Sequence, residues 1–309
     1  MYAGDGFILE IYYGPCWETT GSILTLNIHP GAHISLHWDT PRAFPETLAV
    51  ISAIRDFLAF GTCTHTSVET IEARPVRSTL FGRAFGMFLF HRSLAGTSKQ
   101  EYSFRALFSL EDVQSNLEAV LGGWFQRRQV LQPVIDLHLA PIYNPQMAAE
   151  SQFLAAVQAL EAFHRRTWKT QDLPEDQHSA RMAEVLAGAP EHYREWLSEK
   201  LRYSNELGLR RRIKSLFDEF KDILERFKIE RNAFAATVYN TRNYLTHYDQ
   251  ALADKAAKGR ELQQLIFGMQ LLLDVCLLHA CGVERSKIAS LAERRHGIFF
   301  NRDFGKPAP

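Results

Sequence analysis

The stretch IERNAFAATVYNTRNYLTHYD, residues 229–249, has the pattern of an amphipathic helix. Phe234, Val238 and Leu245 recur at helical spacing, so we expect them to form one apolar stripe that packs inside the protein. The final part, RNYLTHYD, adds a guanidinium, a carboxamide and an imidazole beside this stripe. Two interpretations follow: a solvated helix face, or a small active site.

Helical geometry brings part of this polar set together. Asn243 and His247 are four residues apart, which places them about 40° apart on one helix face. Arg242 lies roughly 140° from His247, but its long side chain can swing its head toward the same groove. Cleavage of RNA through its own 2′-hydroxyl needs a base, an acid and a cation. Histidine transfers protons near neutral pH, and arginine binds phosphate oxygens with a planar fork, so these residue types suit that reaction.

The sequence around this stretch predicts an all-α antiparallel bundle over residues 147–309. Short loops separate segments with helical periodicity, and Gly282 is placed to end the most apolar of them. The expected helices cover residues 148–168, 179–189, 191–206, 207–224, 229–249 and 259–282.

Residues 1–146 have a different pattern, which predicts an α+β domain. Short segments rich in β-branched and aromatic residues predict strands at 7–14, 22–29, 32–39, 82–92 and 101–109. Helical spacing predicts a helix at 44–61 that ends at Gly61, and a second helix that begins at Ser109 with Ser109 and Asp112 as capping residues. The predicted fold is therefore an α+β N-terminal domain followed by an all-α helical bundle.

The composition excludes several classes of protein. Hydrophobic residues make up 46% and charged residues 23% of the 309 residues, which is typical of a soluble globular protein. No apolar run reaches the roughly 20 residues of a membrane span, and the first residues lack the pattern of a secretory signal. The four cysteines have no paired spacing, so we expect a reduced cytoplasmic protein.

No metal or cofactor site is predicted. His29, His33 and His37 have a spacing that would suit zinc on a helix, but Pro30 and Gly31 break a helix there. On a strand, His33 and His37 would lie roughly 13 Å apart, too far to chelate one ion. The cysteines of the most apolar helix, Cys276 and Cys281, are expected to be buried hydrophobic residues.

Further residues near the motif have two possible roles each. Tyr248 either stacks on a base or packs at the helix end, and Asp249 either orients His247 or caps the turn. Arg231 lies about three turns before Arg242 on nearly the same face, where it either extends a phosphate track or serves the start of the helix. A basic run either binds RNA phosphates or forms a solvated face balanced by nearby carboxylates. Its members are Arg210, Arg211, Arg212 and Lys214.

The helical half resembles the HEPN superfamily, whose nuclease members carry an Arg-x4–6-His signature. Arg242, Asn243 and His247 match Arg-Asn-x-x-x-His in type, order and spacing, on a helix followed by one more long apolar helix. The segment FLAAVQALEAFHRRTW, residues 153–168, resembles the opening helix of the ApeA-like branch. LEAVLGGWFQRRQVLQPVIDLHL, residues 117–139, is similar to the N-terminal region of that branch, so the resemblance covers most of the chain.

The resemblance implies a HEPN-type bundle and a metal-independent endoribonuclease without a cofactor. The expected products carry a 2′,3′-cyclic phosphate and a 5′-hydroxyl. His247 would be the general acid or base, Arg242 the phosphate contact, and Asn243 a positioning or phosphate-binding residue. The alternative within the same superfamily is a non-catalytic module that binds nucleotides or partner proteins.

The resemblance also implies partners and a biological role. The expected partners are RNA, either tRNA or another structured or single-stranded RNA, and a second copy of the chain that dimerises through the HEPN domain. ApeA-like proteins are associated with phage defence, which implies a toxin-like effector of abortive infection in the cytoplasm, away from membranes. Residues 1–146 would then sense a phage-derived trigger.

Overall fold

The computed structural model describes residues 2–4, 6–19, 26–68, 70–73, 79–80, 83–84, 87–90, 106–168 and 171–300. The chain divides into two compact units, Met1–Gln129 with Leu278–Arg285 and Val130–Leu277 with Ser286–Pro309. The predicted order, an α+β part followed by a helical bundle, is confirmed. The units divide within helix α3 (Leu117–Tyr143), whereas the predicted domains 1–146 and 147–309 meet in the loop before α4 (Ala149–Thr167).

The first unit contains an antiparallel sheet of strands β1 (Tyr2–Gly4), β2 (Phe7–Thr19) and β3 (Leu26–Trp38), in that order. In the described residues, the strands predicted at 22–29 and 32–39 are joined, because β3 runs from Leu26 through Pro30 and Gly31 to Trp38; residues 22–25 lie outside the described residues. Proline is tolerated at a sheet edge, where its missing N–H leaves no hydrogen bond unmade. β1 pairs only with Phe7–Leu9 of β2, so β1 does not extend the sheet along the part that contains the proline. Short strands pair as β4 (Thr70–Ala73) with β7 (Met87–Phe90) and β5 (Thr79–Leu80) with β6 (Arg83–Ala84).

The strand predicted at 101–109 is not present in its described part. Residues 101–105 lie outside the described residues, and residues 106–109 form no strand. The backbone N–H groups of Leu107 and Phe108 instead donate to the carbonyl of Gly61 at 2.8 and 3.1 Å. Gly61 is needed at this contact, since an added Cβ would lie 2.7 Å from the Phe108 ring.

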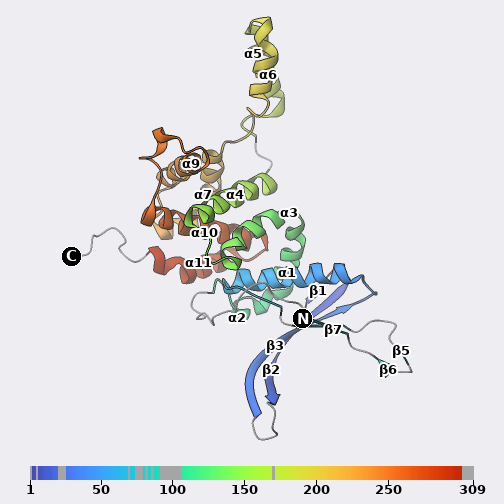
Figure 1. Cartoon of the computed structure of the whole chain (residues 1–309). Helices are drawn as coiled ribbons and strands as arrows, with labels where there is room; N and C mark the ends of the chain where they lie inside the picture. The colour runs from blue at the N-terminus through green and yellow to red at the C-terminus, as the bar shows by residue number, and fades with distance from the viewer. Residues whose placement is uncertain are drawn as a thin grey trace, which may run out of the picture. The chain divides into compact units, whose positions relative to one another are not determined.

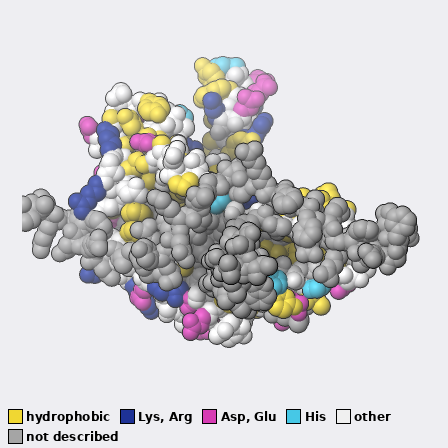
Figure 2. Space-filling view, turned by 60° about the horizontal axis from the view of Figure 1, so that its bottom comes forward, with side chains coloured by type: hydrophobic (Ala, Val, Ile, Leu, Met, Phe, Trp, Pro, Cys, Tyr) yellow, Lys and Arg dark blue, Asp and Glu magenta, His cyan; other side chains and the backbone are white. Residues whose placement is uncertain are grey.

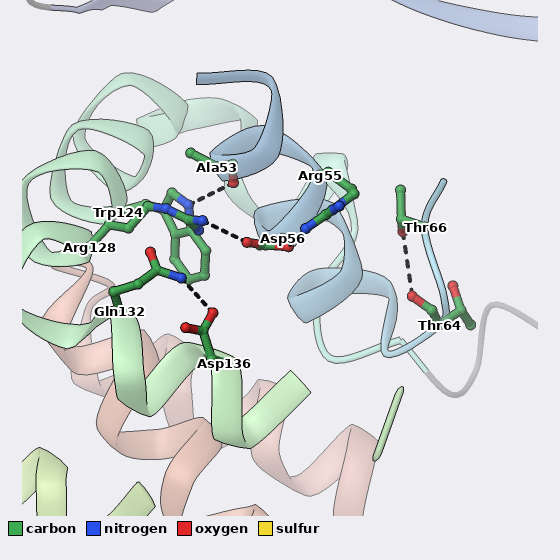
Figure 3. Close-up of polar contacts among 9 residues, drawn as sticks. All are labelled: Ala53, Arg55, Asp56, Thr64, Thr66, Trp124, Arg128, Gln132 and Asp136. Atoms are coloured by element: carbon green, nitrogen blue, oxygen red, sulfur yellow. Dashed lines mark hydrogen bonds and ion pairs between the residues drawn. The ribbon is translucent and has the colours of Figure 1, made fainter. Parts of the chain in front are cut away.

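Helices of the first unit pack around Trp124 of α3. α1 (Phe44–Thr62) ends in a left-handed Cys63, and the Ser109 side chain caps α2 (Leu110–Val113), as predicted for Ser109. Trp124 is 1% exposed, and its Nε1 donates to the carbonyl of Ala53 at 2.9 Å. Figure 3 shows this bond beside the carboxylate of Asp56, which pairs with Arg55 at 2.9 Å and Arg128 at 2.7 Å. These two partners compensate the burial of the Asp56 charge.

The second unit is helical (Figure 1). After α4 come α5 (Glu175–Gly188), α6 (Glu191–Leu201), α7 (Leu209–Glu219), α8 (Lys221–Leu224), the 3-10 helix η3 (Glu225–Phe227), α9 (Arg231–His247), the 3-10 helix η4 (Gln250–Leu252), α10 (Gly259–Ala280) and α11 (Arg285–Phe300). The helices predicted from periodicity are thus present, and Gly282 follows α10 with φ +80°. No helix was predicted after residue 282, but α11 follows α10.

Helix α10 is apolar and mostly buried. Among the described helices it is the one long and apolar enough to cross a membrane by length and composition, which the sequence analysis did not foresee. Within its most apolar window, 72% is buried inside the protein, as in the core helix of a globular domain. The two cysteines of this region are buried as predicted: Cys276 of α10 is 0% exposed, and Cys281, directly after α10, is 3% exposed. Burial raises the pKa of the Cys281 thiol to about 12 and that of Cys276 well above its usual value.

Helices α5 and α6 form a hairpin that projects from the bundle (Figure 1). Neither helix contains a fully buried residue. Tyr193, Trp196 and the following Tyr203 are more than half exposed. The tip of the hairpin, at the top of Figure 2, mixes hydrophobic, acidic and histidine side chains.

Helix α9 is held by one buried face. Helices α4, α7 and α9 contact one another, and Phe234, Ala235, Val238 and Thr241 of α9 are buried. The Phe234 ring lies 5.1 Å from the Phe217 ring of α7. Gly268 of α10 also lies against this ring, since a Cβ added there would lie 2.6 Å from it. The absence of a side chain at Gly268 therefore allows α10 and α9 to approach closely.

A buried polar pair joins α4 to α7. His164 is 0% and Arg212 4% exposed, and the Arg212 Nη1 lies 3.1 Å from the His164 Nδ1. Because a guanidinium can only donate, Nδ1 is the acceptor and His164 is neutral. Burial and the Arg212 charge lower the pKa of His164 to about 4. Arg212 also donates to the carbonyl of Leu207 at 2.7 Å.

A second buried polar cluster joins three helices. The Asp274 carboxylate of α10 lies 2.8 Å from His138 Nε2 of α3 and 2.7 Å from His296 Nε2 of α11. All three side chains are at most 7% exposed. The hydrogen bonds from both histidines hold the pKa of Asp274 well below its usual range, against the opposing effect of burial. This cluster fixes α11, the helix that the sequence analysis missed, to α10.

The close approach at Gly268 predicts the outcome of a substitution. Gly268→Val places new methyl groups against the Phe234 ring, and such overpacking lowers the free energy of unfolding by at least about 2 kcal/mol. Gly188→Val is the matched control, since nothing lies within 4 Å of a Cβ added there. Urea denaturation of both variants measures the difference. Equal stability of the two variants would contradict the packing described for α9 and α10.

The buried His164 predicts a pH dependence of stability. Between the ordinary pKa of 6.5 and the lowered value of about 4, the unfolded chain binds a proton at this site that the folded chain does not. Folding stability therefore falls as the pH drops through this window, by about 3 kcal/mol in total. His164→Gln keeps an acceptor for Arg212 and removes the titration. The difference in free energy of unfolding between wild type and this variant should change over pH 6.5 to 4; a constant difference would contradict a neutral buried His164.

Candidate active site on helix α9

Helix α9 presents Asn243 and His247 away from its buried face and Arg242 at the side of that face. The helix starts at Arg231, where the Glu230 carboxylate accepts hydrogen bonds from the backbone N–H groups of Asn232 and Ala233. These bonds lower the pKa of Glu230, because they stabilise its charged form. From Phe234 to Thr241 one face is buried. His247, the last residue of the helix, is exposed.

Arg242, Asn243 and His247 form the centre of the candidate site. The Arg242 Nη1 donates to the Asn243 Oδ1 at 3.1 Å, and both side chains are partly buried. The Arg242 guanidinium thus reaches Asn243, one of the two residues whose groove it was predicted to join. The His247 side chain makes no hydrogen bond or ion pair with any other described residue, and it is exposed at the end of the helix.

Two tyrosines and a lysine lie beside this centre. Tyr248 is 66% exposed and has the left-handed φ of 52°, and its N–H donates to the Tyr244 carbonyl at 2.6 Å. The two tyrosine rings are 5.9 Å apart in an edge-to-face arrangement. The Lys258 Nζ lies 5.6 Å from the centre of the Tyr244 ring, within cation–π range.

A buried hydrogen bond explains the position of Lys258. The Ala257 N–H donates to the Thr241 hydroxyl at 2.9 Å, and both residues are buried. This bond holds the segment before α10 against the middle of α9. Sequence reasoning missed Lys258, because it follows the motif by a loop and is brought back by this tertiary contact. An exposed lysine carries no signal of that contact in the sequence.

Asp249 caps the chain after α9 and does not orient the catalytic candidate. Its carboxylate accepts from the Ala251 N–H at 3.0 Å, at the start of η4. The sequence left two roles open for Asp249, and in the structure it has the capping role.

The basic residues predicted to contact RNA have different environments. Arg210 and Arg211 are exposed and Lys214 is partly exposed, all on α7. Arg211 pairs with Asp172, and Arg231 pairs with Asp218 at 2.7 Å. Arg231 therefore serves the junction of α7 and α9, although it is still partly exposed.

Arg212 differs from its neighbours in the basic run. Its guanidinium is buried and bonded to His164 and Leu207, so it is not on the surface where RNA would bind. The expectation for Arg212 was wrong because every fourth residue of α7 turns into the bundle, and Arg212 lies beside the buried Ile213 and Leu216.

Within the described ranges, no group of three or more His, Cys, Asp or Glu side chains is arranged to hold a metal ion. The segment with His29, His33 and His37 lies in β3. The exposed His33 stacks on Tyr12 at 4.9 Å, and His37 lies 3.3 Å from Glu10. The polar groups at α9 are a guanidinium, an amide and an imidazole, a set suited to phosphate binding and proton transfer.

Comparison with known proteins identifies the helical region. Residues 154–287 match the family model described as Apea-like HEPN, a span that starts in α4, contains α9 and reaches the start of α11. The searches of curated proteins and of solved structures gave no match. HEPN domains are generally ribonucleases, which agrees with the phosphate-binding and proton-transferring groups on α9. The matched span, residues 154–287, contains the helix that carries Arg242, Asn243 and His247, so this helical region is similar to ApeA-like HEPN domains.

Proposed function

We propose that the protein is a metal-independent endoribonuclease that cleaves RNA by attack of a 2′-hydroxyl. One observation carries this proposal: the exposed His247 lies on the same helix as Arg242, whose guanidinium is oriented by Asn243. A proton-transfer group, a fixed cation and an amide are the groups that this reaction uses. The family supports an RNA-related nuclease activity, and the residue roles and reaction course are our proposal.

The reaction has a simple balance. A neutral imidazole accepts the proton of the 2′-hydroxyl while O2′ attacks the adjacent phosphorus. The bond from phosphorus to O5′ breaks, and an imidazolium donates a proton to O5′. The products are a 2′,3′-cyclic phosphate and a 5′-hydroxyl. The Arg242 guanidinium contacts the non-bridging oxygens, where charge develops.

Two proton transfers favour two copies of the chain in one site. Each protomer contributes a single motif histidine, yet the reaction needs one neutral and one protonated imidazole at the same time. We therefore propose a homodimer in which the two α9 helices face one cleft and each supplies His247. The exposure of His247 leaves it accessible for such a composite site.

The biological role is part of the proposal, and the match to the Apea-like HEPN model is what suggests it. We propose a toxin-like effector of antiphage abortive infection that cleaves tRNA or another structured or single-stranded RNA. The α+β part, residues 1–146, would bind a phage-derived trigger. Arg210, Arg211 and Lys214 would contact RNA phosphates outside the cleaved position; for Arg211 and Arg231 this requires exchange of their ion pairs with Asp172 and Asp218.

The proposed activity predicts the effect of removing either motif side chain. His247→Ala and Arg242→Ala should each lower the cleavage rate at least about 100-fold, since each removes a group that acts on the reacting phosphate. Cleavage of a labelled RNA in the presence of EDTA measures this, and the termini are identified by mass spectrometry. His192→Ala is the matched control, because His192 is an exposed histidine of the α5–α6 hairpin.

The result separates the proposal from its alternative. Cleavage by wild type and His192→Ala, with both motif variants folded and inactive, supports the nuclease. Binding of nucleotides or RNA without cleavage by any variant supports the non-catalytic module. Equal cleavage by His247→Ala and wild type would show that α9 does not carry the active site.

A further inference from the structure

The residue that follows the motif is placed as a contact surface rather than as part of the core. Tyr248 is 66% exposed, and its ring meets the Tyr244 ring edge-on at 5.9 Å. A helix end at which the chain turns into the left-handed region normally carries glycine or asparagine, and a bulky residue is uncommon there. Tyr248 occupies this position with φ 52°. Neither burial nor backbone geometry therefore explains an aromatic side chain here.

A cation lies next to the same two rings. The exposed Lys258 has its Nζ 5.6 Å from the centre of the Tyr244 ring. The buried bond from Ala257 to Thr241 fixes the backbone one residue earlier. A lysine beside an aromatic pair is the combination that single-stranded nucleic acid uses: bases stack on the rings, and phosphates pair with the cation.

From these contacts we propose that Tyr244, Tyr248 and Lys258 form a nucleobase platform, in which Tyr248 stacks on the base next to the cleaved phosphate and Lys258 binds a neighbouring phosphate. The inference rests on the proposed ribonuclease function and deepens it. Because Tyr248 directly follows His247, a base on its ring lies next to the phosphate that His247 acts on. The platform requires that this base is unpaired, and it accepts any base because every base has an aromatic face.

The first experiment measures RNA binding apart from cleavage. In a His247→Ala background, which is expected not to cleave, binding of a short unstructured RNA is compared for Tyr248, Tyr248→Phe and Tyr248→Gly. The phenylalanine variant keeps the ring and should bind as its parent does. The glycine variant should bind about 10-fold more weakly, from the usual contribution of one stacked base. Tyr203→Ala is the matched control, since Tyr203 is 67% exposed on the hairpin.

A stability measurement distinguishes the platform from a structural role. Glycine at position 248 relieves the left-handed φ, so Tyr248→Gly should have a Tm equal to or above that of wild type while its RNA binding and cleavage fall. A structural tyrosine would produce the opposite combination, with a lower Tm. An RNA with an abasic nucleotide beside the cleaved bond should lower wild-type cleavage to the level of Tyr248→Gly and have no further effect on that variant.

The lysine is tested by the salt dependence of binding. Lys258→Gln should lower the slope of log affinity against log salt by about 0.7, the value for one lost phosphate contact with a single strand. Lys255→Gln, an exposed lysine three residues earlier, should leave the slope unchanged.

The outcomes for the platform and for the enzyme are separable. If wild type cleaves RNA and Tyr248→Gly binds and cleaves as well as wild type, the platform is wrong and the ribonuclease proposal stands. If wild type neither binds nor cleaves RNA, the ribonuclease proposal fails and the platform fails with it. Loss of cleavage in Tyr248→Gly together with a lower Tm would assign Tyr248 a structural role and overturn the platform.

Discussion

A buried hydrogen bond between the Ala257 N–H and the Thr241 hydroxyl fixes the orientation on which the candidate site depends. Thr241 is 0% exposed, so either group left unpaired would cost about 1–3 kcal/mol. The bond couples the middle of α9 to the start of α10. Together with the contacts of Phe234 with Phe217 and Gly268, this bond leaves one face of α9 to meet solvent. Asn243, His247 and Tyr248 lie toward that face or at its end.

Local periodicity was enough to predict most helices. It failed where contacts between residues far apart in the sequence determine the structure. α9 and α10 have clear apolar stripes, and Ser109 and Gly282 have ordinary capping chemistry, so each could be found from neighbouring residues. α11 was missed because RSKIASLAERRHGIFF mixes basic residues with its apolar ones. It is held by contacts that no local pattern contains, including the hydrogen bond from His296 to Asp274.

The same division applies to the site. Helix geometry alone places Asn243 beside His247, and the long side chain of Arg242 reaches Asn243 as expected. Helix geometry could not predict which residues of the basic run are buried and which are exposed. Arg212 and Arg211 are adjacent in sequence, yet the bundle buries one against His164 and leaves the other exposed beside Asp172. Lys258 is the reverse case, an ordinary surface lysine in the sequence that the Thr241 bond brings to Tyr244.

We propose that α9 is the centre of an RNA-cleaving surface supported by an otherwise ordinary helical core, and that His247 acts on RNA inside the cell. The most direct measurement is sequencing of RNA ends that bear a 5′-hydroxyl after induction of the protein, with wild type compared to His247→Ala. New 5′-hydroxyl ends that accumulate at defined positions with wild type and are absent with His247→Ala are the predicted result. Identical sets of ends in the two samples would contradict the claim.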